Sequence, residues 1–394
     1  MGPVRMFSKT TPGGPGRRSW PRFWRALTAP GWRPRAAPAG PRPAVIPWLR
    51  RWCSSTGSRL LMAMLVASGG NACARPPDGW TQFKAAYVQP DGRTIDPENG
   101  GVSHSESQGW TMLLAEGHGD REAFDKAWGW TRANLVRKNA PLLAWRYDPR
   151  SRPAVADENN ASDGDILAAW ALLRAGRRWK DDGYLAASRA MREAVAERLV
   201  VEVGGRTVLL PGLEGFRSPA GIVTNPSYFV LPALQDFAVE DGPAAPWRTL
   251  VADGVKLARE GRFGAQKLPP DWLLVRADGG LALAPEKPPL FGFDAIRVPL
   301  YLAWGGEDSL ARDTAAYWRG KIQAQKAPPA WVNMSDGHEA DFPLSGGGVA
   351  IAALALDDPS IQALRGASQD RTYYSSALVL LAEMAGREKG GKRP

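Results

Sequence analysis

Two short segments of this chain place acidic side chains at predicted helix starts, beside aromatic residues. The first is SESQGW at residues 105–110, which contains Glu106, and the second is ASDGD at residues 161–165, which contains Asp163. A third acid, Asp294, lies in the segment FDAIR at residues 293–297. Hydrolysis of a glycosidic bond needs one carboxylic acid that protonates the leaving oxygen and one carboxylate that activates water. This set of acids therefore indicates a sugar-cleaving enzyme.

Glu106 is the candidate general acid. Residues 105–108 have the spacing of a capping box, in which Ser105 satisfies backbone amides and Glu106 occupies the first turn. An acid there can simply complement the helix dipole, which contributes about 0.3–1 kcal/mol. The neighbouring Trp110 and Met112 favour catalysis, because apolar surroundings disfavour the charged carboxylate and keep a proton available for donation.

Asp163 stands where an N-cap is expected, with Asp165 two residues later, before a long apolar run. Two acids around one glycine also resemble part of a calcium loop, but the regular oxygen ligands and closing glutamate of an EF-hand are missing. The chain's histidines, His104, His118 and His338, have no spacing typical of zinc ligands. We therefore expect an enzyme that needs no metal and no cofactor.

Asp294 and Arg297 could form an ordinary ion pair on a helix surface, worth about 0.2–0.5 kcal/mol. The aromatic residues around them favour a sugar-binding cleft instead, since aromatic faces stack on the C–H surfaces of pyranose rings. Any one aromatic residue is more often part of a core than of a binding site. The candidates for the lining are Trp145, Tyr228, Trp304, Tyr373 and Tyr374.

The formal net charge of +10 is concentrated in a leader. Residues 1–74 hold 12 of the 50 basic residues and no acid, so the remaining 38 face all 40 acidic residues of the chain. This distribution argues against nucleic acid as a partner. Both cysteines, Cys53 and Cys73, also lie in the leader, so a chain cut after Ala74 could form no disulfide.

The end of this leader has the order of a secretory signal. Basic residues precede a run of about ten apolar residues at 60–68, and the small residues Ala72-Cys73-Ala74 follow shortly after it. A membrane span needs about 20 apolar residues, so a transmembrane anchor is the weaker alternative, as is a lipoprotein. We expect export to the periplasm or beyond, with no integral membrane segment after cleavage. Residues 75–394 then form one catalytic domain.

Apolar residues recur at helical spacing throughout residues 75–394, while strand signals are few. The clearest is a hairpin over residues 272–283 with its turn at Asp278-Gly279. Many helix hairpins in one domain favour a closed toroid over an open solenoid, although periodicity alone does not separate them. About a dozen helices are expected, and they start near Gly79, Ser105, Asp120, Asp163, Gly183, Asn225, Ala244, Asp294, Glu307, Ser345, Asp358 and Asp370.

These motifs resemble glycoside hydrolase family 8, and within it the periplasmic endoglucanases of bacterial cellulose synthesis operons. The most specific element is residues 161–179, ASDGDILAAWALLRAGRRW, which follows the family signature with one mild departure at Ala168. Residues 79–84, 92–97, 225–228 and 294–297 are also similar to the family, and the likeness covers nearly all of residues 75–390.

The resemblance implies an all-α fold, the (α/α)6 toroid of helix hairpins with small β excursions, and inverting endo-hydrolysis of β-1,4-glucan. It implies that Glu106 is the proton donor, that Asp294 is the base, and that Asp163 helps to distort the central sugar. Trp145, Tyr228, Arg297 and Tyr374 are the residues that it implies touch the glucan. It also implies a role in trimming new cellulose, with the cellulose synthase machinery as a further partner.

Three of the chain's departures from the family bear on the fit around these acids. Ser107 and Thr111 replace small residues and add bulk, and Phe293 replaces a tyrosine and cannot donate a hydrogen bond. Two alternatives remain open at this point. One is the same fold acting on xylan or chitosan, and the other is a weakly catalytic glucan-binding subunit of a cellulose secretion complex.

Overall fold

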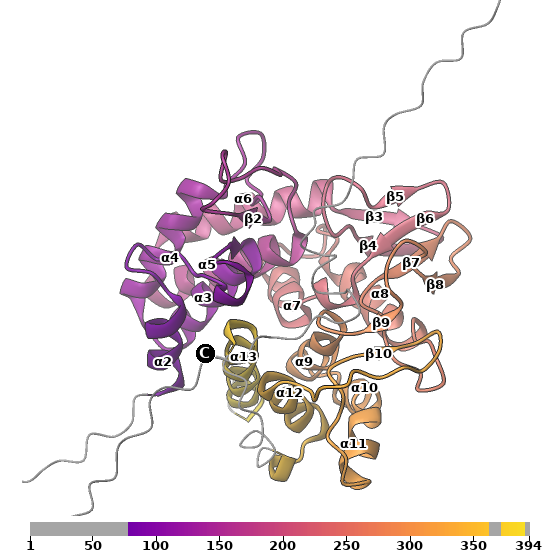
Figure 1. Cartoon of the computed structure of the whole chain (residues 1–394). Coiled ribbons are helices and arrows are strands. Elements are labelled where there is room, and N and C mark those ends of the chain that lie inside the picture. Colours follow the sequence, from indigo (N-terminus) through magenta and orange to yellow (C-terminus); the bar gives the residue numbers. More distant parts are fainter. Residues whose placement is uncertain (1–77, 362–371, 391–394) are drawn as a thin grey trace, which may run out of the picture. The chain divides into compact units, whose positions relative to one another are not determined.

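The computed structural model describes residues 78–361 and 372–390, and this part of the chain is built mainly of α-helices (Figure 1). The leader and the signal, predicted within residues 1–74, lie outside the described residues. The helices are α2 Gly79–Tyr87, α3 Ser105–Gly117, α4 Arg121–Asn134, α5 Ser162–Trp179, α6 Asp182–Arg198, α7 Leu231–Glu240, α8 Trp247–Glu260, α9 Val298–Trp304, α10 Asp308–Thr314, α11 Ala316–Gln323, α12 Gly346–Leu356 and α13 Tyr373–Gly390.

Side-chain caps explain several of the helix starts. Asp78 accepts a hydrogen bond from the Thr81 amide at the start of α2, and Ser345 accepts one from the Gly348 amide at the start of α12. Asp120 and Asp181 cap α4 and α6 in the same way. The starts predicted near Gly79, Asp120, Gly183 and Ser345 are thus confirmed.

The caps predicted for the two acidic segments were wrong in detail. The N-cap of α3 is His104 rather than Ser105, and the Ser107 hydroxyl binds both the amide and the carbonyl of His104. The N-cap of α5 is Ala161, so Asp163 lies inside the first turn. Glu106 and Asp163 each follow the first residue of their helix, which places both carboxylates at helix N-terminal ends.

Other differences arise from prolines and short turns. The helix expected near Asn225 is delayed, because a 3-10 turn at Pro226–Tyr228 precedes α7. A second 3-10 turn, Ala295–Arg297, likewise separates Asp294 from α9. The helix expected near Ala244 begins at Trp247, α11 was not anticipated, and the start predicted at Asp370 lies outside the described residues.

The helices pack in a closed circuit. α3 packs on α5, α5 on α7, α7 on α9, and α9 on α12 and α13, while α13 returns to pack on α2 and α3. A second set lies outside, with α4 on α3, α6 on α5, α8 on α7 and α10 on α9. Every residue of α5 from Ile166 to Leu173 is buried, as expected for an inner helix. The closed arrangement rules out the open solenoid.

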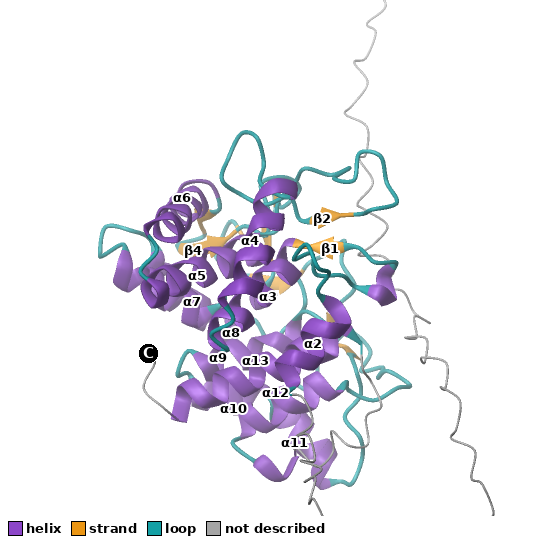
Figure 2. Ribbon diagram, turned by 90° about the vertical axis from the view of Figure 1, so that its left-hand side faces the viewer, coloured by secondary structure: helices purple, strands orange, loops and turns teal. Residues whose placement is uncertain are grey.

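The strands are short and lie among the loops between helices (Figure 2). β5, β6, β7 and β8 form an antiparallel sheet in that order, which confirms the predicted hairpin with its turn at Asp278-Gly279, whereas the β3–β4 hairpin was not anticipated. The strands are β1 Ser103–His104, β2 Arg146–Tyr147, β3 Val200–Val203, β4 Arg206–Leu209, β5 Arg217–Ser218, β6 Gly221–Thr224, β7 Leu273–Arg276, β8 Leu281–Leu283, β9 Leu290–Phe291 and β10 Val332–Asn333.

β1 pairs with β2, and β9 pairs with β10. The first pair holds the loop that contains Trp145 against the start of α3, where the Ser105 amide donates to the Trp145 carbonyl at 3.1 Å. In the described part of the chain, no helix is both long and apolar enough to span a membrane.

Candidate active site

Arg297 joins the three candidate acids. Its Nη2 atom lies 3.0 Å from Glu106 Oε1, 3.2 Å from Asp294 Oδ1 and 3.6 Å from Asp163 Oδ2. Only 4% of the Arg297 side chain is exposed, so the pair with Asp294 is not a surface ion pair. The structure therefore brings together four residues that come from three separate segments of the sequence.

Two glycines allow α3 and α5 to approach closely enough to place Glu106 beside Asp163. A Cβ atom on Gly164 would lie 2.1 Å from Ser105 Oγ and 2.8 Å from the Glu106 amide nitrogen. A Cβ atom on Gly109 would lie 2.7 Å from Leu167 Cβ. Any larger residue would push these helices apart, so the spacing of the acids depends on the absence of these side chains.

The Arg297 guanidinium is held on several sides besides the acids. Nη2 donates to Ser227 Oγ at 3.0 Å, and Nη1 donates to the Tyr374 hydroxyl at 3.3 Å. The guanidinium carbon lies 5.7 Å from the centre of the Trp110 ring, within range of a cation–π interaction. These contacts fix the arginine, and the arginine in turn fixes the carboxylates.

The surroundings give Glu106 and Asp294 different protonation behaviour. Burial raises the pKa of Glu106 well above its ordinary value, Arg297 opposes this, and the charge of Asp163 raises the pKa further. A hydrogen bond between Glu106 and Asp163 raises the pKa of Glu106 and lowers that of Asp163, which places the shared proton on Glu106. Burial also raises the pKa of Asp294, but Arg297, Asn225 and Lys287 lower it. This asymmetry suits Glu106 to donate a proton and Asp294 to accept one.

Glu106 is also the most accessible of the three acids. Its side chain is 20% exposed, whereas those of Asp294 and Asp163 are 9% and 5% exposed. An acid that protonates a bridging oxygen must reach the substrate, so this exposure agrees with the role that the sequence suggested for Glu106.

Three of the predicted aromatic residues lie near the acids. Charges on Asp163, Asp294 and Glu106 add to burial in raising the pKa of Tyr228, which places this ring beside the carboxylates. The Tyr374 hydroxyl donates to the Phe293 carbonyl, next to Asp294. The third residue is Trp145.

The Trp145 ring stacks on His104, two residues before Glu106, with ring centres 6.0 Å apart. Its Nε1 atom donates to Asp157 Oδ2 at 3.0 Å, which orients the indole. Trp145 therefore lies at the N-terminal end of α3, the end that carries Glu106.

The expectation that Trp304 and Tyr373 line the cleft was wrong. Trp304 is at the C-terminal end of α9, where its ring packs against Trp170 and its Nε1 atom donates to Glu388 at 2.8 Å. Tyr373 is buried, and its ring lies against Phe83, Tyr87 and Trp110. Both are core residues, which is the commoner role for a large aromatic side chain.

The three family departures are accommodated. The Ser107 hydroxyl binds the His104 backbone at the start of α3, and the Thr111 hydroxyl hydrogen bonds with the Thr94 hydroxyl at 2.7 Å. The Phe293 ring meets Tyr374 edge-on with centres 6.4 Å apart. The hydroxyl groups of residues 107 and 111 therefore form hydrogen bonds within the protein.

Two functional candidates were not found from the sequence. Lys287 lies with its Nζ atom 4.3 Å from the centre of the Trp272 ring, and its charge lowers the pKa of Asp294. Asp271 is buried and binds the backbone on either side of Asp294. Neither belongs to a motif, and the only sequence signal is an acid directly before the predicted strand at 272–276.

The calcium-loop alternative is not supported by the contacts of Asp165. Its Oδ1 atom accepts from the Leu143 amide and its Oδ2 atom accepts from the Asn160 side chain, both at 2.7 Å. Both oxygens are therefore used in holding the 143–160 loop against α5. Within residues 78–361 and 372–390, no group of three or more His, Cys, Asp or Glu residues is arranged to hold a metal ion.

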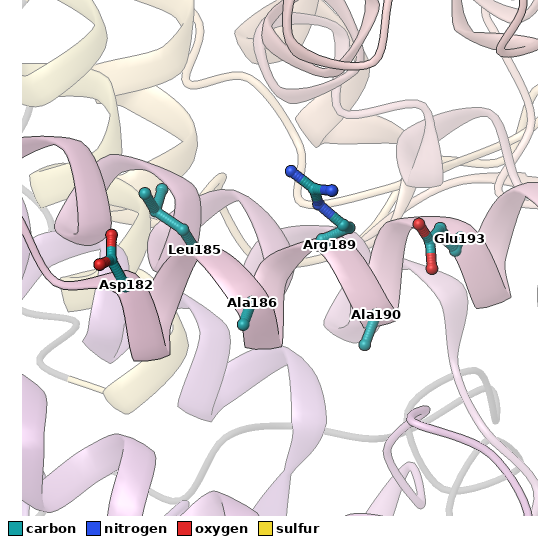
Figure 3. A pocket seen from close by; sticks show the side chains of 6 residues that line it. All are labelled: Asp182, Leu185, Ala186, Arg189, Ala190 and Glu193. Carbon is teal, nitrogen blue, oxygen red and sulfur yellow. The ribbon is translucent and has the colours of Figure 1, made fainter.

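A shallow depression on the surface is unrelated to these acids. Figure 3 shows its lining, which comes from one face of α6: Asp182, Leu185, Ala186, Arg189, Ala190 and Glu193. The opposite face of α6, which includes the buried Met191 and Val195, packs on α5. A depression formed by a single outer helix does not have the converging polar groups of a catalytic site.

A ring of helix hairpins with three carboxylates gathered around one arginine defines a glycoside hydrolase of the (α/α)6 class. The sequence pattern of Glycosyl hydrolases family 8 matches residues 52–388, and the chain belongs to that family.

Proteins that are similar to this chain in sequence and proteins that are similar in structure are both named as endoglucanases. The chain is 42% identical to an endoglucanase from Cellulomonas uda over 305 residues, which cover 76% of this chain and 84% of that protein. It is similar to the structure of endoglucanase Cel10, a family 8 glycosyl hydrolase from Klebsiella pneumoniae, with a TM-score of 0.74, 42% identity, and coverage of 79% of this chain and 99% of that one. It is also similar to the endo-beta-1,4-glucanase CMCax from Acetobacter xylinum, with a TM-score of 0.73, 38% identity, and coverage of 79% and 98%.

Proposed function

We propose that this protein is an inverting endo-β-1,4-glucanase that hydrolyses cellulose. The observation that carries the proposal is the shared contact of Glu106 and Asp294 with one Arg297 nitrogen, in surroundings that keep a proton on Glu106 and positive charge near Asp294. The relatives named endoglucanase support β-1,4-glucan as the substrate.

In the proposed reaction, Glu106 gives its proton to the glycosidic oxygen as the bond to the anomeric carbon breaks. Asp294 removes a proton from a water molecule, whose oxygen attacks the anomeric carbon from the opposite face. The leaving sugar gains one proton, the other fragment gains a hydroxyl group, and the configuration inverts. Inversion requires a separation of about 6.5–9.5 Å between the two carboxyl groups. Glu106 Oε1 and Asp294 Oδ1 both contact Arg297 Nη2, at 3.0 and 3.2 Å, so these two oxygens lie closer together than that range, and the wider separation is a prediction for the substrate complex.

Asp163 has a positioning role in this proposal. It binds Glu106 and lies near Arg297, so it orients the donor and helps hold the central sugar in a distorted shape. Trp145, Tyr228, Arg297 and Tyr374 are proposed to contact the glucan, with the tyrosine and indole rings stacking on sugar faces. The site uses no metal and no cofactor in this mechanism.

The cellular setting is also a proposal. Residues 1–74 act as a leader that is removed on export to the periplasm or beyond, and residues 75–394 form the catalytic domain. The resemblance to a glucanase from Acetobacter xylinum supports a role beside the cellulose synthase machinery, where the enzyme trims new chains. Mass spectrometry of the exported protein tests the cleavage after Ala74.

One experiment tests the activity and its stereochemistry together. Proton NMR of the fresh product from a cello-oligosaccharide is expected to show the α-anomer first, because a β-linkage is inverted. Release of reducing sugar from carboxymethylcellulose, xylan and chitosan, compared side by side, separates a glucanase from a xylanase or chitosanase. An initial β-anomer contradicts inversion, and release from xylan or chitosan alone contradicts the substrate.

Paired variants separate an enzyme from a glucan-binding subunit. Glu106→Gln and Asp294→Asn are each expected to lower kcat by about 10²–10⁴-fold, since each removes one half of the acid/base pair. If both variants leave hydrolysis and cellulose output unchanged, the protein acts by binding glucan and the enzymatic proposal fails.

A further inference from the structure

Asp271 lies just before β7, 23 positions from Asp294, yet it is bound directly to the turn that carries this acid. Its Oδ1 atom accepts a hydrogen bond from the Gly292 amide at 3.0 Å and another from the Ala295 amide at 2.7 Å. These two amides lie on either side of Asp294. A single carboxylate oxygen therefore closes the turn around the candidate base.

The backbone of Asp271 adds a third connection to the same segment. Its amide donates to the Leu290 carbonyl at 2.8 Å, so both main chain and side chain of Asp271 hold residues 290–295. The next residue, Trp272, stacks on Phe216 with ring centres 5.9 Å apart, which fixes this end of β7 in the core. The support for Asp294 thus comes from a rigid element.

Gly292 shows how closely the two segments fit. A Cβ atom at this position would lie 2.6 Å from Asp271 Oδ2, which is too short for a real contact. Only glycine lets the turn approach the carboxylate closely enough for both amides to donate. Asp271 and Gly292 are therefore complementary, since the side chain of Asp271 occupies the space that a side chain at residue 292 would need.

Two other bonds extend this support to Arg297. The Arg297 amide donates to the Asp294 carbonyl at 3.0 Å, and the Ile296 amide donates to the Gly292 carbonyl at 3.1 Å. The turn that Asp271 clamps is thus the one that directs Arg297 Nη2 toward the three acids. A small shift of this turn would move the base and the arginine together.

Given the proposed hydrolase function, we infer that Asp271 is a positioning residue for the reaction, which clamps the 292–295 turn and so sets the direction of Asp294. Asp271 does not touch the sugar in this role and acts only through the backbone amides. Burial, and then the negative charge of Asp294, raises the pKa of Asp271 to about 8. Burial and the charge of Asp294 therefore favour the neutral form of Asp271, which leaves the negative charge to Asp294.

Three variants test the inference through kcat and KM on a soluble cello-oligosaccharide. Asp271→Ala removes the acceptor and is expected to lower kcat by about 10²-fold with KM within about threefold, since misplacing a reacting group by about 1 Å has an effect of this size. Asp271→Asn keeps an oxygen that can accept both amides and is expected to recover kcat to within about tenfold of wild type. Gly292→Ala places a methyl group against Asp271 Oδ2 and is expected to show the same loss of kcat as Asp271→Ala.

Asp253 is the matched control. It is also a buried acid that accepts a backbone amide, that of Thr207 at 2.8 Å, but it joins α8 to β4 instead of holding the 292–295 turn. Asp253→Ala is expected to lower the melting temperature without lowering kcat. Equal kcat losses in Asp271→Ala and Asp253→Ala, or a kcat for Asp271→Ala within threefold of wild type, would overturn the inference.

A second readout does not depend on turnover. In a crystal structure of the Asp271→Ala variant, or of Gly292→Ala if the first does not fold, the 3.0 Å contact between Arg297 Nη2 and Glu106 Oε1, which joins the clamped turn to α3, is expected to lengthen. An unchanged contact contradicts the positioning role. A wild-type protein that is inactive on every β-1,4-glucan overturns the proposed function instead, and the crystallographic result still decides the role of Asp271.

Discussion

Gly164 and Ser105 meet where α5 crosses α3, and a Cβ atom on Gly164 would lie 2.1 Å from Ser105 Oγ. This contact sets the distance between the two helix ends that carry Asp163 and Glu106. The glycine between the two acids of the 161–165 segment is therefore needed for the approach of another helix.

Gly164→Ala is expected to destabilise the protein by about 1–3 kcal/mol, because the added methyl group forces the helices apart. It is also expected to lower kcat, since Glu106 moves with α3. Gly129→Ala in α4 is the control: nothing lies within 4 Å of the place that its methyl group would take, so it should stabilise the protein by about 0.4–1 kcal/mol. Urea unfolding measures both changes, and equal effects in the two variants contradict the crossing as the cause.

The pH dependence of kcat/KM should be bell-shaped and displaced upward. Activity appears as Asp294 loses its proton and disappears as Glu106 loses its own, and burial raises both pKa values. Because the pKa of Glu106 is raised well above 4.5, the basic limb should lie well above that value. Rates measured from about pH 4 to pH 9 check this. A basic limb near the ordinary glutamate pKa argues against Glu106 as the donor.

Asp163→Asn is expected to lower kcat by about tenfold or more while changing KM much less, because Asp163 orients Glu106 and Arg297 rather than only binding sugar. The control is Asp182→Asn, which changes an exposed acid in the first turn of α6 and should leave both constants unaltered. Equal losses in kcat and affinity for Asp163→Asn indicate a structural acid instead.

A buried ion pair network stabilises the opposite ends of these helices. Arg174 lies 2.7 Å from both Glu116 and Glu388 and stacks over Trp170. Arg174→Met removes the nearest cation from the buried Glu116 and from Glu388, while Arg178 stays 3.3 Å from Glu116 and the Trp304 N–H still binds Glu388, so it is expected to cost about 3 kcal/mol. Lys126→Met, which breaks an exposed pair with Glu122, should cost about 0.5 kcal/mol or less. Similar midpoints for the two variants in urea contradict the distinction between buried and exposed pairs.

Stability should fall as the pH rises from about 4 to about 7. Burial raises the pKa of Asp165 to about 7, so the folded state binds a proton more tightly than the unfolded state does. The stability from this proton is fully present below the unfolded pKa and is lost as the pH passes through the folded pKa.

Asp165→Asn cannot titrate, so its melting temperature should vary less with pH than that of the wild type, even if it is lower throughout. Calorimetry at several pH values measures the two slopes. Identical slopes would mean that Asp165 does not contribute to the pH dependence.

Local pattern was sufficient for much of the fold. The caps at Asp78, Asp120 and Ser345 and the hairpin turn at Asp278-Gly279 depend on residues only a few positions apart, and such signals can be read from sequence. The delayed start of α7 was missed because the 3-10 turn at Pro226–Tyr228 has no helical periodicity of its own.

The candidate site was only partly predictable. Glu106, Asp163 and Asp294 stand in recognisable motifs, but their meeting at Arg297 depends on a closed circuit of helices that no local pattern specifies. From the sequence, Trp304 and Trp145 were both candidates for the lining of the cleft. Only their packing in the structure shows that Trp304 is a core residue and that Trp145 lies beside the acids. Asp271 was missed because its partners are backbone amides more than twenty positions away.

The packing of α13 on α2 and α3 has a consequence for biosynthesis. Tyr374 on α13 supports Arg297, which holds Glu106, yet these residues are separated by most of the domain in chain order. A nascent polypeptide that lacks residues 373–390 has an open circuit and an incompletely supported arginine. Hydrolytic competence is therefore acquired only after nearly the whole domain has emerged from the ribosome, and prematurely terminated products should be inert.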